Sequence, residues 1–334
     1  MADGTVLVTG ATGFIGSVLT RQLVAEDANV RILRRETSSL DLLGSVANEV
    51  EHAVGDVTYA RSLYDAMRDV DRVFHVAAKV SFAPGDQASL RRVNVEGTAN
   101  VVNAALEADV DRLVHTSSIA ALGRPRTPNS TIDEDTSWQD APHRTAYARS
   151  KRQAEMEVHR GIAEGLEAVF VNPSLVFGVG NAHTNTRRIV DAVRSGWMVA
   201  VPPGGTNVVD VRDVAAGHRA AMTNGEPGRR YIIGGDNRSW MDIATTLAKA
   251  FDVPRPRYTI PAPLLRASSA AAEAVATLTR SPPLLSRETA RTACHTYRFD
   301  NTRARTELDC TFRPFSDTAE RLAQVLSASK AASA

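Results

Sequence analysis

The sequence is poor in several features that would point to particular classes of protein. Its two cysteines, Cys294 and Cys310, are too few for a disulfide framework and lack the spacing of metal ligands, so no metal is expected. The net charge of +1 gives no basic or acidic excess, so neither a nucleic-acid partner nor a membrane partner is expected. The most apolar stretch, 261–278, is interrupted by Arg266 and Glu273, which favours a buried or amphipathic helix over a membrane span.

These absences favour an ordinary globular protein. Hydrophobic residues make up 43% and charged residues 23% of the 334 residues, enough for one large domain or two unequal ones. The first predicted strand begins at Thr5, which leaves no room for a signal peptide. We therefore expect a cytoplasmic protein.

Lysine is also scarce, which makes the surroundings of Lys151 informative. Only four of the 39 basic residues are lysines, yet Lys151 follows Tyr147 by four residues in TAYARSKRQAE (145–155). This segment predicts a helix, and four residues make one turn, so the two side chains should share a face. An ammonium roughly 4 Å from a tyrosine hydroxyl would lower the tyrosine pKa from about 10 toward 7. Lysine also has three rotatable donors that can bind ribose hydroxyls.

The first half of the chain alternates apolar strands with helices. Strands are predicted at 5–10, 29–33, 72–78, 112–118 and the start of 167–178, and helices at 14–26, 62–70, 90–108 and 145–164. This alternation indicates right-handed crossovers and an α/β fold of the Rossmann type, a doubly wound parallel sheet.

The second half is looser and predicts a smaller, irregular C-terminal substrate domain. We expect an NADP-binding Rossmann domain at 1–178, to which 206–233 returns, and a substrate-binding domain at 179–205 and 234–330. Ser239 is the expected N-cap of a helix at 239–251.

A glycine-rich turn joins the first strand to the first helix. In VTGATGFIG, Gly10 permits the tight turn, Gly13 lets the backbone approach a pyrophosphate, and Gly16 lets the helix pack on the sheet. The helix N-terminus supplies free N–H donors for a phosphate. The residues expected to line the dinucleotide at this turn are Gly10, Thr12, Gly13, Phe14, Ile15 and Gly16.

Arginines stand at the end of the second strand, where an acidic residue is expected for NAD. Arg34 or Arg35 can form a paired hydrogen bond with a 2′-phosphate, so NADP(H) is preferred. Glu36 could still bind a ribose hydroxyl, which leaves NAD(H) as the alternative. After the next strand, Asp56 is either an acceptor for the adenine amino group or a plain turn residue, with Val57 beside it.

The order of the motifs resembles a known family. TGATGFIG, GDV, HVAA, NVEGT, HTSS, YARSK and NPSLVFG occur as in the extended short-chain dehydrogenases/reductases, the NAD-dependent epimerase/dehydratase superfamily, over roughly 5–320. NPSLVFG and DVRDVAAGH are most similar to dihydroflavonol-4-reductase-like proteins and to hopanoid-associated sugar epimerase relatives.

The resemblance implies roles for the matching residues. Tyr147 would be the catalytic acid and base, Lys151 its partner, and Ser118 the residue that binds the carbonyl oxygen, with Ser117 as the alternative. Asn94 would support the site from the neighbouring helix. The other implied cofactor contacts are Ala77, Ala78, Lys79, Pro173 and Ser174.

Several further residues have both a functional and a structural interpretation. Phe82 and Trp138 are candidate substrate contacts or packing residues, and Trp138 and His143 fall in a loop at 123–145 that should lie over the active site. His75 and His115 lie within apolar strands and are expected to be core histidines with satisfied hydrogen bonds.

The leading functional hypothesis is an NADPH-dependent reductase of a small-molecule aldehyde or ketone. The alternatives are a nucleotide-sugar epimerase with tightly bound NAD(P) and a non-catalytic NADP-sensing regulator. The epimerase is disfavoured because Thr206 and Asn207 stand where related epimerases carry an arginine, although Arg187 or Arg188 could supply the charge. Arg212 is expected to be a packing or ion-pair residue. By the resemblance, helices 90–108 and 145–164 would form a homodimer interface.

Overall fold

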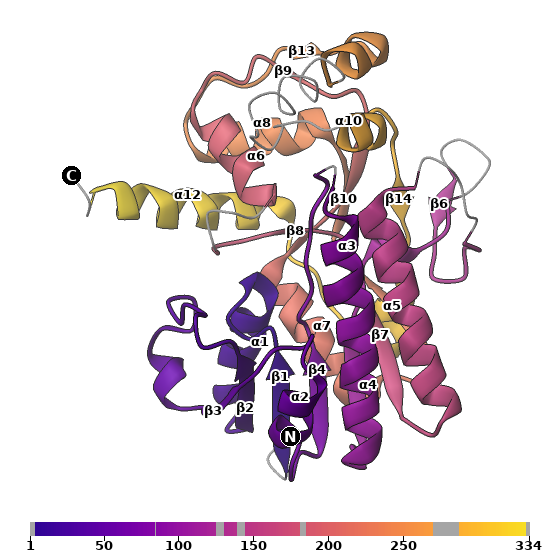
Figure 1. The fold of residues 1–334 in the computed structure, drawn as a ribbon. Helices are drawn as coiled ribbons and strands as arrows, with labels where there is room; N and C mark the ends of the chain where they lie inside the picture. Colours follow the sequence, from indigo (N-terminus) through magenta and orange to yellow (C-terminus); the bar gives the residue numbers. More distant parts are fainter. Residues whose placement is uncertain are drawn as a thin grey trace.

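A seven-stranded parallel sheet forms the centre of the larger unit, the lower part of the molecule in Figure 1. The computed structural model describes residues 4–83, 85–124, 130–138, 144–180, 185–269 and 287–331. The strand order is β3-β2-β1-β4-β5-β7-β11, and every neighbouring pair is parallel. The strands are β1 (Thr5–Thr9), β2 (Asn29–Arg34), β3 (Glu51–Val54), β4 (Arg72–His75), β5 (Arg112–Thr116), β7 (Ala168–Pro173) and β11 (Arg230–Ile233). The order reverses between β1 and β4, which is where such sheets bind ligands.

Helices cover both faces of this sheet, as the apolar strands require (Figure 1). Apolar side chains of α1 and α7 form one core with β1 and β7, and those of α2, α4 and α5 form a second core on the other face. The helices are α1 (Phe14–Val24), α7 (Val211–Asn224), α2 (Ala60–Ala66), α4 (Gly97–Glu107) and α5 (Ala146–Ala163). The predicted α/β, doubly wound architecture is confirmed.

The helix predicted at 90–108 is interrupted. It consists of α3 (Gln87–Leu90), a π-helical turn η2 (Arg91–Glu96) and α4. Buried Asn94 lies in the π-helical turn, and its side chain bonds Lys79 and Ser150. Single π-helical turns are frequent at functional sites. Apolar periodicity does not distinguish such a turn from a continuous helix.

The second half builds a smaller unit on a three-stranded sheet of order β12-β10-β8. Apolar residues of this sheet pack with those of α6, α8 and α12 in a separate core. These elements are β8 (Leu175–Phe177), β10 (Gly205–Asp210), β12 (Asp236–Ser239), α6 (Asn185–Arg194), α8 (Trp240–Ala250) and α12 (Phe315–Ala331). Ser239 is the N-cap of α8, as predicted, and forms a capping box with Asp242.

Short elements complete the fold. They are η1 (Gly44–Asn48), η3 (Ile119–Ala121), β6 (Thr131–Ile132), β9 (Ala200–Val201), β13 (Tyr258–Thr259), α10 (Arg287–Ala293), β14 (Arg298–Phe299) and α11 (Thr302–Glu307). Within the described ranges, no helix is both long and apolar enough to cross a membrane.

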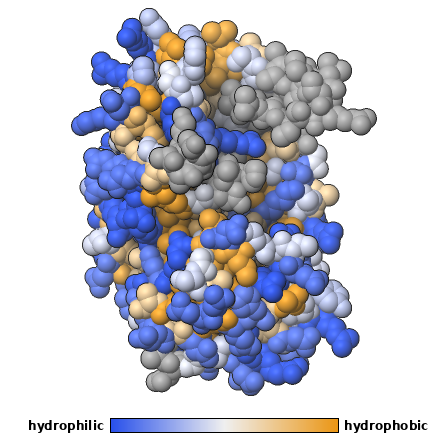
Figure 2. Space-filling view, turned by 90° about the vertical axis from the view of Figure 1, so that its left-hand side faces the viewer, coloured by the Kyte–Doolittle hydropathy of each residue, from blue (hydrophilic) through white to orange (hydrophobic). Residues whose placement is uncertain are grey.

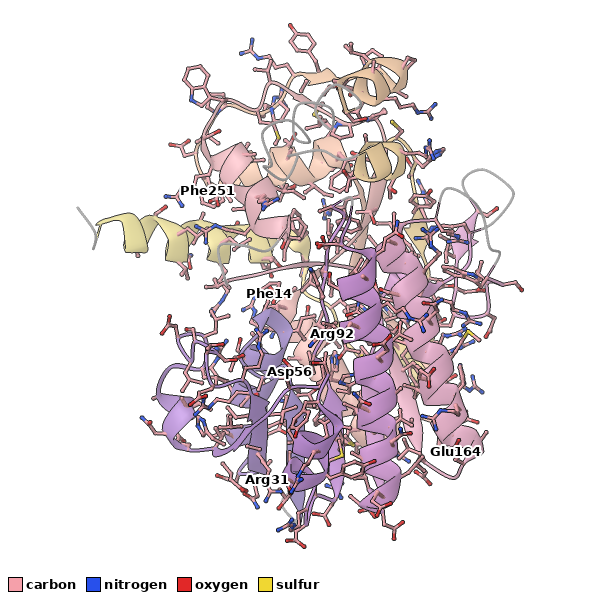
Figure 3. The ribbon with its side chains drawn as sticks, viewed as in Figure 1. Phe14, Arg31, Asp56, Arg92, Glu164 and Phe251 are labelled. Atoms are coloured by element: carbon pink, nitrogen blue, oxygen red, sulfur yellow. The ribbon has the colours of Figure 1, made fainter. Side chains whose placement is uncertain are left out.

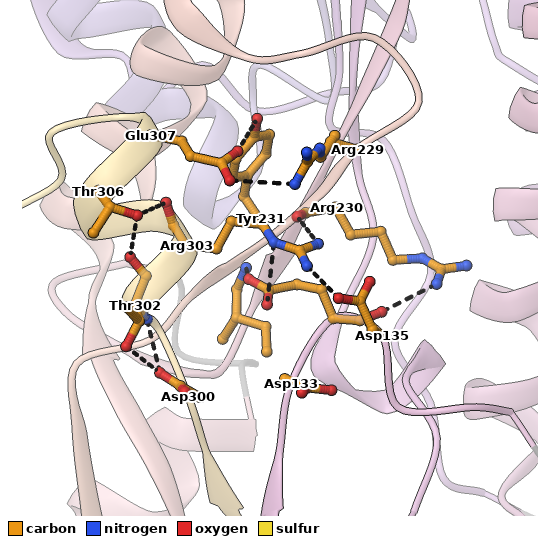
Figure 4. Close-up of polar contacts among 12 residues, drawn as sticks. Asp133, Asp135, Arg229, Arg230, Tyr231, Asp300, Thr302, Arg303, Thr306 and Glu307 are labelled. Atoms are coloured by element: carbon orange, nitrogen blue, oxygen red, sulfur yellow. Dashed lines mark hydrogen bonds and ion pairs between the residues drawn. The ribbon is translucent and has the colours of Figure 1, made fainter.

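A polar network fixes α11 beside the last strand of the large sheet (Figure 4). Arg303 of α11 pairs with Asp135 and lies 3.8 Å from buried Glu134. Glu134 in turn accepts a 2.9 Å hydrogen bond from the backbone N–H of Ile232 in β11. The network thereby connects the loop after β6 to β11. Arg230, the first residue of β11, also pairs with Glu155 of α5.

Candidate active site

The glycine turn after β1 brings three backbone segments into close contact. Gly10 has a φ of +71°, and a Cβ there would lie 2.7 Å from the Cα of Ala77, in the segment after β4. A Cβ on Gly16 would overlap the carbonyl oxygen of Gly10, so the helix can approach the turn only with glycine at this position. The Gly13 N–H donates to that carbonyl at 2.9 Å and closes the turn.

The N-terminus of α1 is suited to a phosphate group. Gly13 is its N-cap and offers no side-chain acceptor, and the first turn contains no acidic residue. The first N–H groups of a helix have no intrahelical acceptor, so those of Phe14, Ile15 and Gly16 are available to an anion, with Thr12 in the same turn. A dinucleotide pyrophosphate fits this arrangement of backbone donors. Figure 3 shows Phe14 at the end of α1 that faces the second unit.

Arg34 and Arg35, at the end of β2, differ in exposure and in hydrogen bonding. Arg34 donates through Nε to His52 on β3 at 2.8 Å, so part of its guanidinium is already used. Arg35 is exposed, and no acceptor for its side chain is found among the described residues. Of the two, Arg35 therefore has more hydrogen-bonding capacity left for a 2′-phosphate.

Asp56 and Val57 follow β3, and Asp56 is labelled in Figure 3. Asp56 Oδ1 accepts from the backbone N–H and the hydroxyl of Thr58, each at 2.8 Å, as in a turn. The other carboxylate oxygen remains for a ligand, so Asp56 can be a turn residue and an adenine contact together. Val57 is buried against Gly97 of α4.

Backbone contacts fix the segment after β4. The N–H of Ala77 donates to Thr9 Oγ1 at 3.2 Å, and Asn94 accepts from the Lys79 N–H at 2.7 Å and donates to its carbonyl at 2.9 Å. Asn94 therefore positions the path 77–79, which includes exposed Ala78. The Lys79 ammonium instead pairs with Asp86 at 3.1 Å.

Ser118, Tyr147 and Lys151 meet at the carboxyl end of β5. Lys151 is 2% exposed, and its Nζ donates to the carbonyl oxygen of Thr116 at 2.7 Å. Tyr147 stands one turn earlier on the same face of α5, with the ring of Phe82 edge-on at 5.6 Å between centroids. Ser118 begins the short turn η3, where it accepts from the N–H of Ala120 at 3.1 Å.

The protonation of this cluster differs from the sequence-based expectation. Burial raises the pKa of Tyr147 above its ordinary value, and a hydrogen bond with Ser118 opposes that shift. Burial also lowers the pKa of Lys151 to about 8, which the nearby Glu155 carboxylate opposes. The prediction that Lys151 lowers the pKa of Tyr147 was therefore wrong. Burial has the largest effect on this pKa and raises it. At neutral pH Tyr147 is a protonated phenol.

Glu155, one turn beyond Lys151, was missed by the sequence analysis. It is fully buried, and its carboxylate accepts from Ser117 at 2.7 Å, from Asn172 at 3.0 Å and from Arg230 at 3.0 Å. Asn172 also donates to the carbonyl oxygen of Ser118 at 3.1 Å. The spacing of four residues from Tyr147 to Lys151 to Glu155 was the available signal, since it places all three on one face of α5.

This network also separates the two candidate serines. The Ser117 hydroxyl is buried and donates to Glu155. The Ser118 hydroxyl instead bonds Tyr147, and this bond partly offsets the rise in the tyrosine pKa that burial causes. The geometry thus favours Ser118 as the serine that works with Tyr147.

The end of β7 contributes Pro173 and Ser174. Both are buried, and the Ser174 hydroxyl has no hydrogen-bond partner among the described residues, although its backbone N–H donates to Ile233. An unpartnered buried hydroxyl at the carboxyl edge of the sheet can bind a ligand amide. This agrees with a nicotinamide beside Ser174.

Two aromatic candidates have different surroundings. Phe82 contacts Tyr147, which places it within the site. The Trp138 ring packs under the Arg144 guanidinium, 4.2 Å from its centroid, so one ring face is already covered. His143 and the loop parts 125–129 and 139–143 lie outside the described residues.

The two core histidines also differ. His75 bonds Thr9 at 2.8 Å and Thr98 at 3.0 Å, as expected for a satisfied core residue. His115 is equally buried, but both of its ring nitrogens lack a partner within the described part of the chain. Burial lowers the pKa of each ring, so both are neutral.

Comparisons with known proteins identify the family of the chain. Residues 6–234 match the model of the NAD dependent epimerase/dehydratase family. The chain is 37% identical to "Sterol demethylase protein B" of Methylococcus capsulatus over 78% of this chain and 79% of that relative. It is also 37% identical to a "Putative dihydroflavonol 4-reductase" of Synechocystis over 78% and 76%. A solved structure titled "Crystal structure of gox2253" shares 34% identity over 96% of each chain, with a TM-score of 0.83.

More distant structures share the fold alone. The UDP-glucose 4-epimerase of Thermotoga maritima is 16% identical, with a TM-score of 0.78, over 97% of this chain and 99% of that one. The family match over most of the chain and the relatives of 37% identity decide the assignment. The chain belongs to the NAD-dependent epimerase/dehydratase family and is an NAD(P)-dependent enzyme of the extended short-chain dehydrogenase/reductase type.

Proposed function

We propose that this protein reduces an aldehyde or ketone to an alcohol with NADPH. The observation that carries the proposal is the meeting of Ser118, Tyr147 and buried Lys151 at the carboxyl end of β5, with Lys151 bonded to the Thr116 carbonyl oxygen and Ser118 acting on the Tyr147 hydroxyl. A protonated phenol such as that of Tyr147 can give a proton to a carbonyl oxygen.

Each side chain has a part in the proposed reaction. A dinucleotide held at the N-terminus of α1 and beside Ser174 would supply a hydride. Ser118 and Tyr147 donate hydrogen bonds to the substrate carbonyl oxygen, and the Tyr147 proton passes to that oxygen as the negative charge develops. Lys151 stabilises the phenolate that remains and provides donors for the ribose. The carbonyl thereby gains one hydride and one proton, and the alcohol leaves with the oxidised cofactor.

The surroundings of β10 support a reductase over a nucleotide-sugar epimerase. Asn207 is fully buried and donates to Asn237 at 3.1 Å, in the region where such epimerases would need a cation for the diphosphate. Arg212 is paired with Asp210 at 2.7 Å, as expected from the sequence, and Arg187 bonds Asp191 at 2.9 Å. Exposed Arg188 is the remaining candidate for a diphosphate contact.

The test is a screen of NADPH oxidation with aldehydes, ketones and dihydroflavonols, with UDP- and GDP-sugars in parallel. We expect one NADPH consumed per alcohol formed and no binding of UDP at micromolar concentrations. Calorimetry that finds micromolar UDP binding, and its loss in Arg188→Ala, would favour the epimerase instead. A chain that binds NADPH but turns over neither class would support the non-catalytic sensor.

Cofactor preference gives a second expected result. Arg35→Ser should weaken NADPH binding by about 10- to 100-fold, because a hydrogen-bonded charge on the 2′-phosphate is lost, and should leave NADH binding unchanged. Arg34→Ser should have a smaller effect, since Arg34 is already bonded to His52. Fluorescence titration of both cofactors measures this, and equal binding of NADPH and NADH by the unaltered protein would refute the preference.

We also propose a homodimer formed through α4 and α5. An Arg160–Asn103 hydrogen bond of 2.8 Å joins the outer faces of these helices, and Met156 of α5 is 58% exposed. Light scattering should then give twice the 35.9 kDa of one chain, and Met156→Glu should reduce that mass. A mass near 35.9 kDa for the unaltered protein would exclude the dimer.

A further inference from the structure

Four large apolar side chains stand exposed on two neighbouring segments of the second unit. Trp197 is 86% exposed, Tyr258 64%, Leu264 61% and Val199 56%, and we call these four residues the apolar end surface. Single exposed apolar residues are common, whereas neighbouring ones mark interaction sites. Trp197 is the most exposed of the large hydrophobic residues in the described ranges.

Backbone pairing brings the two segments together. β9 and β13 run parallel, with Tyr258 opposite Ala200, and the N–H groups of Arg257 and Tyr258 donate to the Val199 carbonyl at 2.9 and 3.2 Å. Leu264 follows on a helix at 262–269. β9 and β13 lie at the end of the molecule farthest from the amino ends of the large sheet (Figure 1). Figure 2 shows hydrophobic residues beside strongly hydrophilic ones at this end.

The charge of these segments has one sign. Residues 194–205 and 253–269 contain four arginines and no acidic residue, although the whole chain has a net charge of only +1. The arginines are Arg194, Arg255, Arg257 and Arg266, and the last three are exposed. None of the four forms an ion pair with another described residue, and Arg255, Arg257 and Arg266 face solvent.

We propose that the apolar end surface docks the protein on an anionic lipid bilayer. Tryptophan and tyrosine favour the headgroup level of a membrane, leucine and valine can enter the acyl boundary, and arginines beside them attract anionic lipids. A second copy of this chain is a poor occupant, because a symmetric contact would bring eight uncompensated arginines together. An acidic protein partner would also match the charges of the arginines. The exposed Trp197 and Tyr258 favour a lipid surface instead, because these residue types prefer the headgroup level of a membrane.

Buried residues lie next to the apolar end surface in the sequence. Leu265 and Pro256 are buried, although each is adjacent in sequence to exposed residues, so the segments that carry the surface are packed against the protein. Insertion then orders few side chains and carries a small entropic cost. The inference is independent of the reaction proposed above. It opposes the sequence-based expectation of no membrane partner, which rested on the net charge of the whole chain.

The test uses vesicles of phosphatidylcholine alone and of phosphatidylcholine with 30% phosphatidylglycerol, in co-sedimentation at two salt concentrations. We expect binding to the anionic vesicles, weaker at higher salt. Arg255→Ser/Arg257→Ser should weaken it about 30-fold, since each basic residue near such a surface strengthens binding about fivefold. Trp197→Ser/Tyr258→Ser should also weaken it.

Matched controls exclude a general effect of charge or polarity. Arg61→Ser/Arg68→Ser and Tyr64→Ser alter exposed residues in and just after α2, at a distance from this surface, and should bind vesicles like the unaltered protein. The far-UV circular dichroism spectrum and the thermal unfolding midpoint should be unchanged in every variant, which verifies folding. Absent or lipid-independent binding, or equal binding by Arg255→Ser/Arg257→Ser, would overturn the proposal. A fall in light-scattering mass in Trp197→Ser/Tyr258→Ser would instead assign the surface to a second copy.

Discussion

Tyr147→Phe is expected to lower kcat by about a thousandfold and to leave the dissociation constant for NADPH nearly unchanged. The ring and its edge-on contact with Phe82, 5.6 Å between centroids, remain, so the site should keep its shape. The lost hydroxyl is the proton donor, and removal of a positioned general acid costs about 10²- to 10⁴-fold in rate. Single-turnover rates of NADPH oxidation and a fluorescence titration measure the two quantities.

Two serine variants serve as controls for this result. Ser118→Ala should reduce kcat strongly, because Ser118 shares the carbonyl oxygen with Tyr147 in the proposed reaction. Ser117→Ala should mainly reduce stability, since its hydroxyl is directed to Glu155 at 2.7 Å. A Tyr147→Phe enzyme that keeps more than about a tenth of the unaltered rate would contradict the proposed acid, and a stronger loss in Ser117→Ala would exchange the two serines.

Much of the fold could be predicted because it depends on local patterns. Apolar runs bounded by glycine and alternating with helices define a parallel sheet covered on both faces, and the structure has that sheet. The turn at Gly10, Gly13 and Gly16 was predictable because each glycine has its own steric reason. Ser239 was recognisable as an N-cap from its place before an amphipathic helix.

Features that depend on tertiary contacts could not be predicted in this way. The π-helical turn at Asn94 forms where one side chain bonds both Lys79 and Ser150, which are distant in sequence. The direction of the Tyr147 pKa depends on how deeply its hydroxyl is buried, whereas the spacing to Lys151 showed only that the two share a helix face. A net charge of +1 likewise conceals the local excess of arginine at the apolar end surface.

The role of Glu155 leads to the last prediction. Glu155→Gln is expected to lower the free energy of unfolding by about 3 kcal/mol, because it removes a buried charge that pairs with Arg230 at 3.0 Å. The amide also cannot accept every hydrogen bond that the carboxylate takes from Ser117, Asn172 and Arg230. Since Asn172 bonds the Ser118 carbonyl, kcat should fall more than NADPH affinity.

The pH profile separates an effect on the site from a general loss of stability. The Glu155 carboxylate raises the pKa of Lys151, which burial holds at about 8, so its neutralisation should lower that pKa further. The ammonium is the working form of Lys151, and activity is lost as the pH rises through its pKa. The alkaline limb of the kcat profile should therefore move to lower pH in Glu155→Gln.

Glu157→Gln is the matched control on the same helix. Glu157 is partly exposed and pairs with Arg160 at 3.2 Å, so its loss should change the unfolding free energy by less than about 0.5 kcal/mol and leave the pH profile unchanged. Urea denaturation and kcat measured across pH 6 to 10 test both variants. A Glu155→Gln enzyme with reduced stability but an unaltered alkaline limb would show that Glu155 only supports the fold, because a residue that positions Ser118 and maintains the charge of Lys151 must affect both.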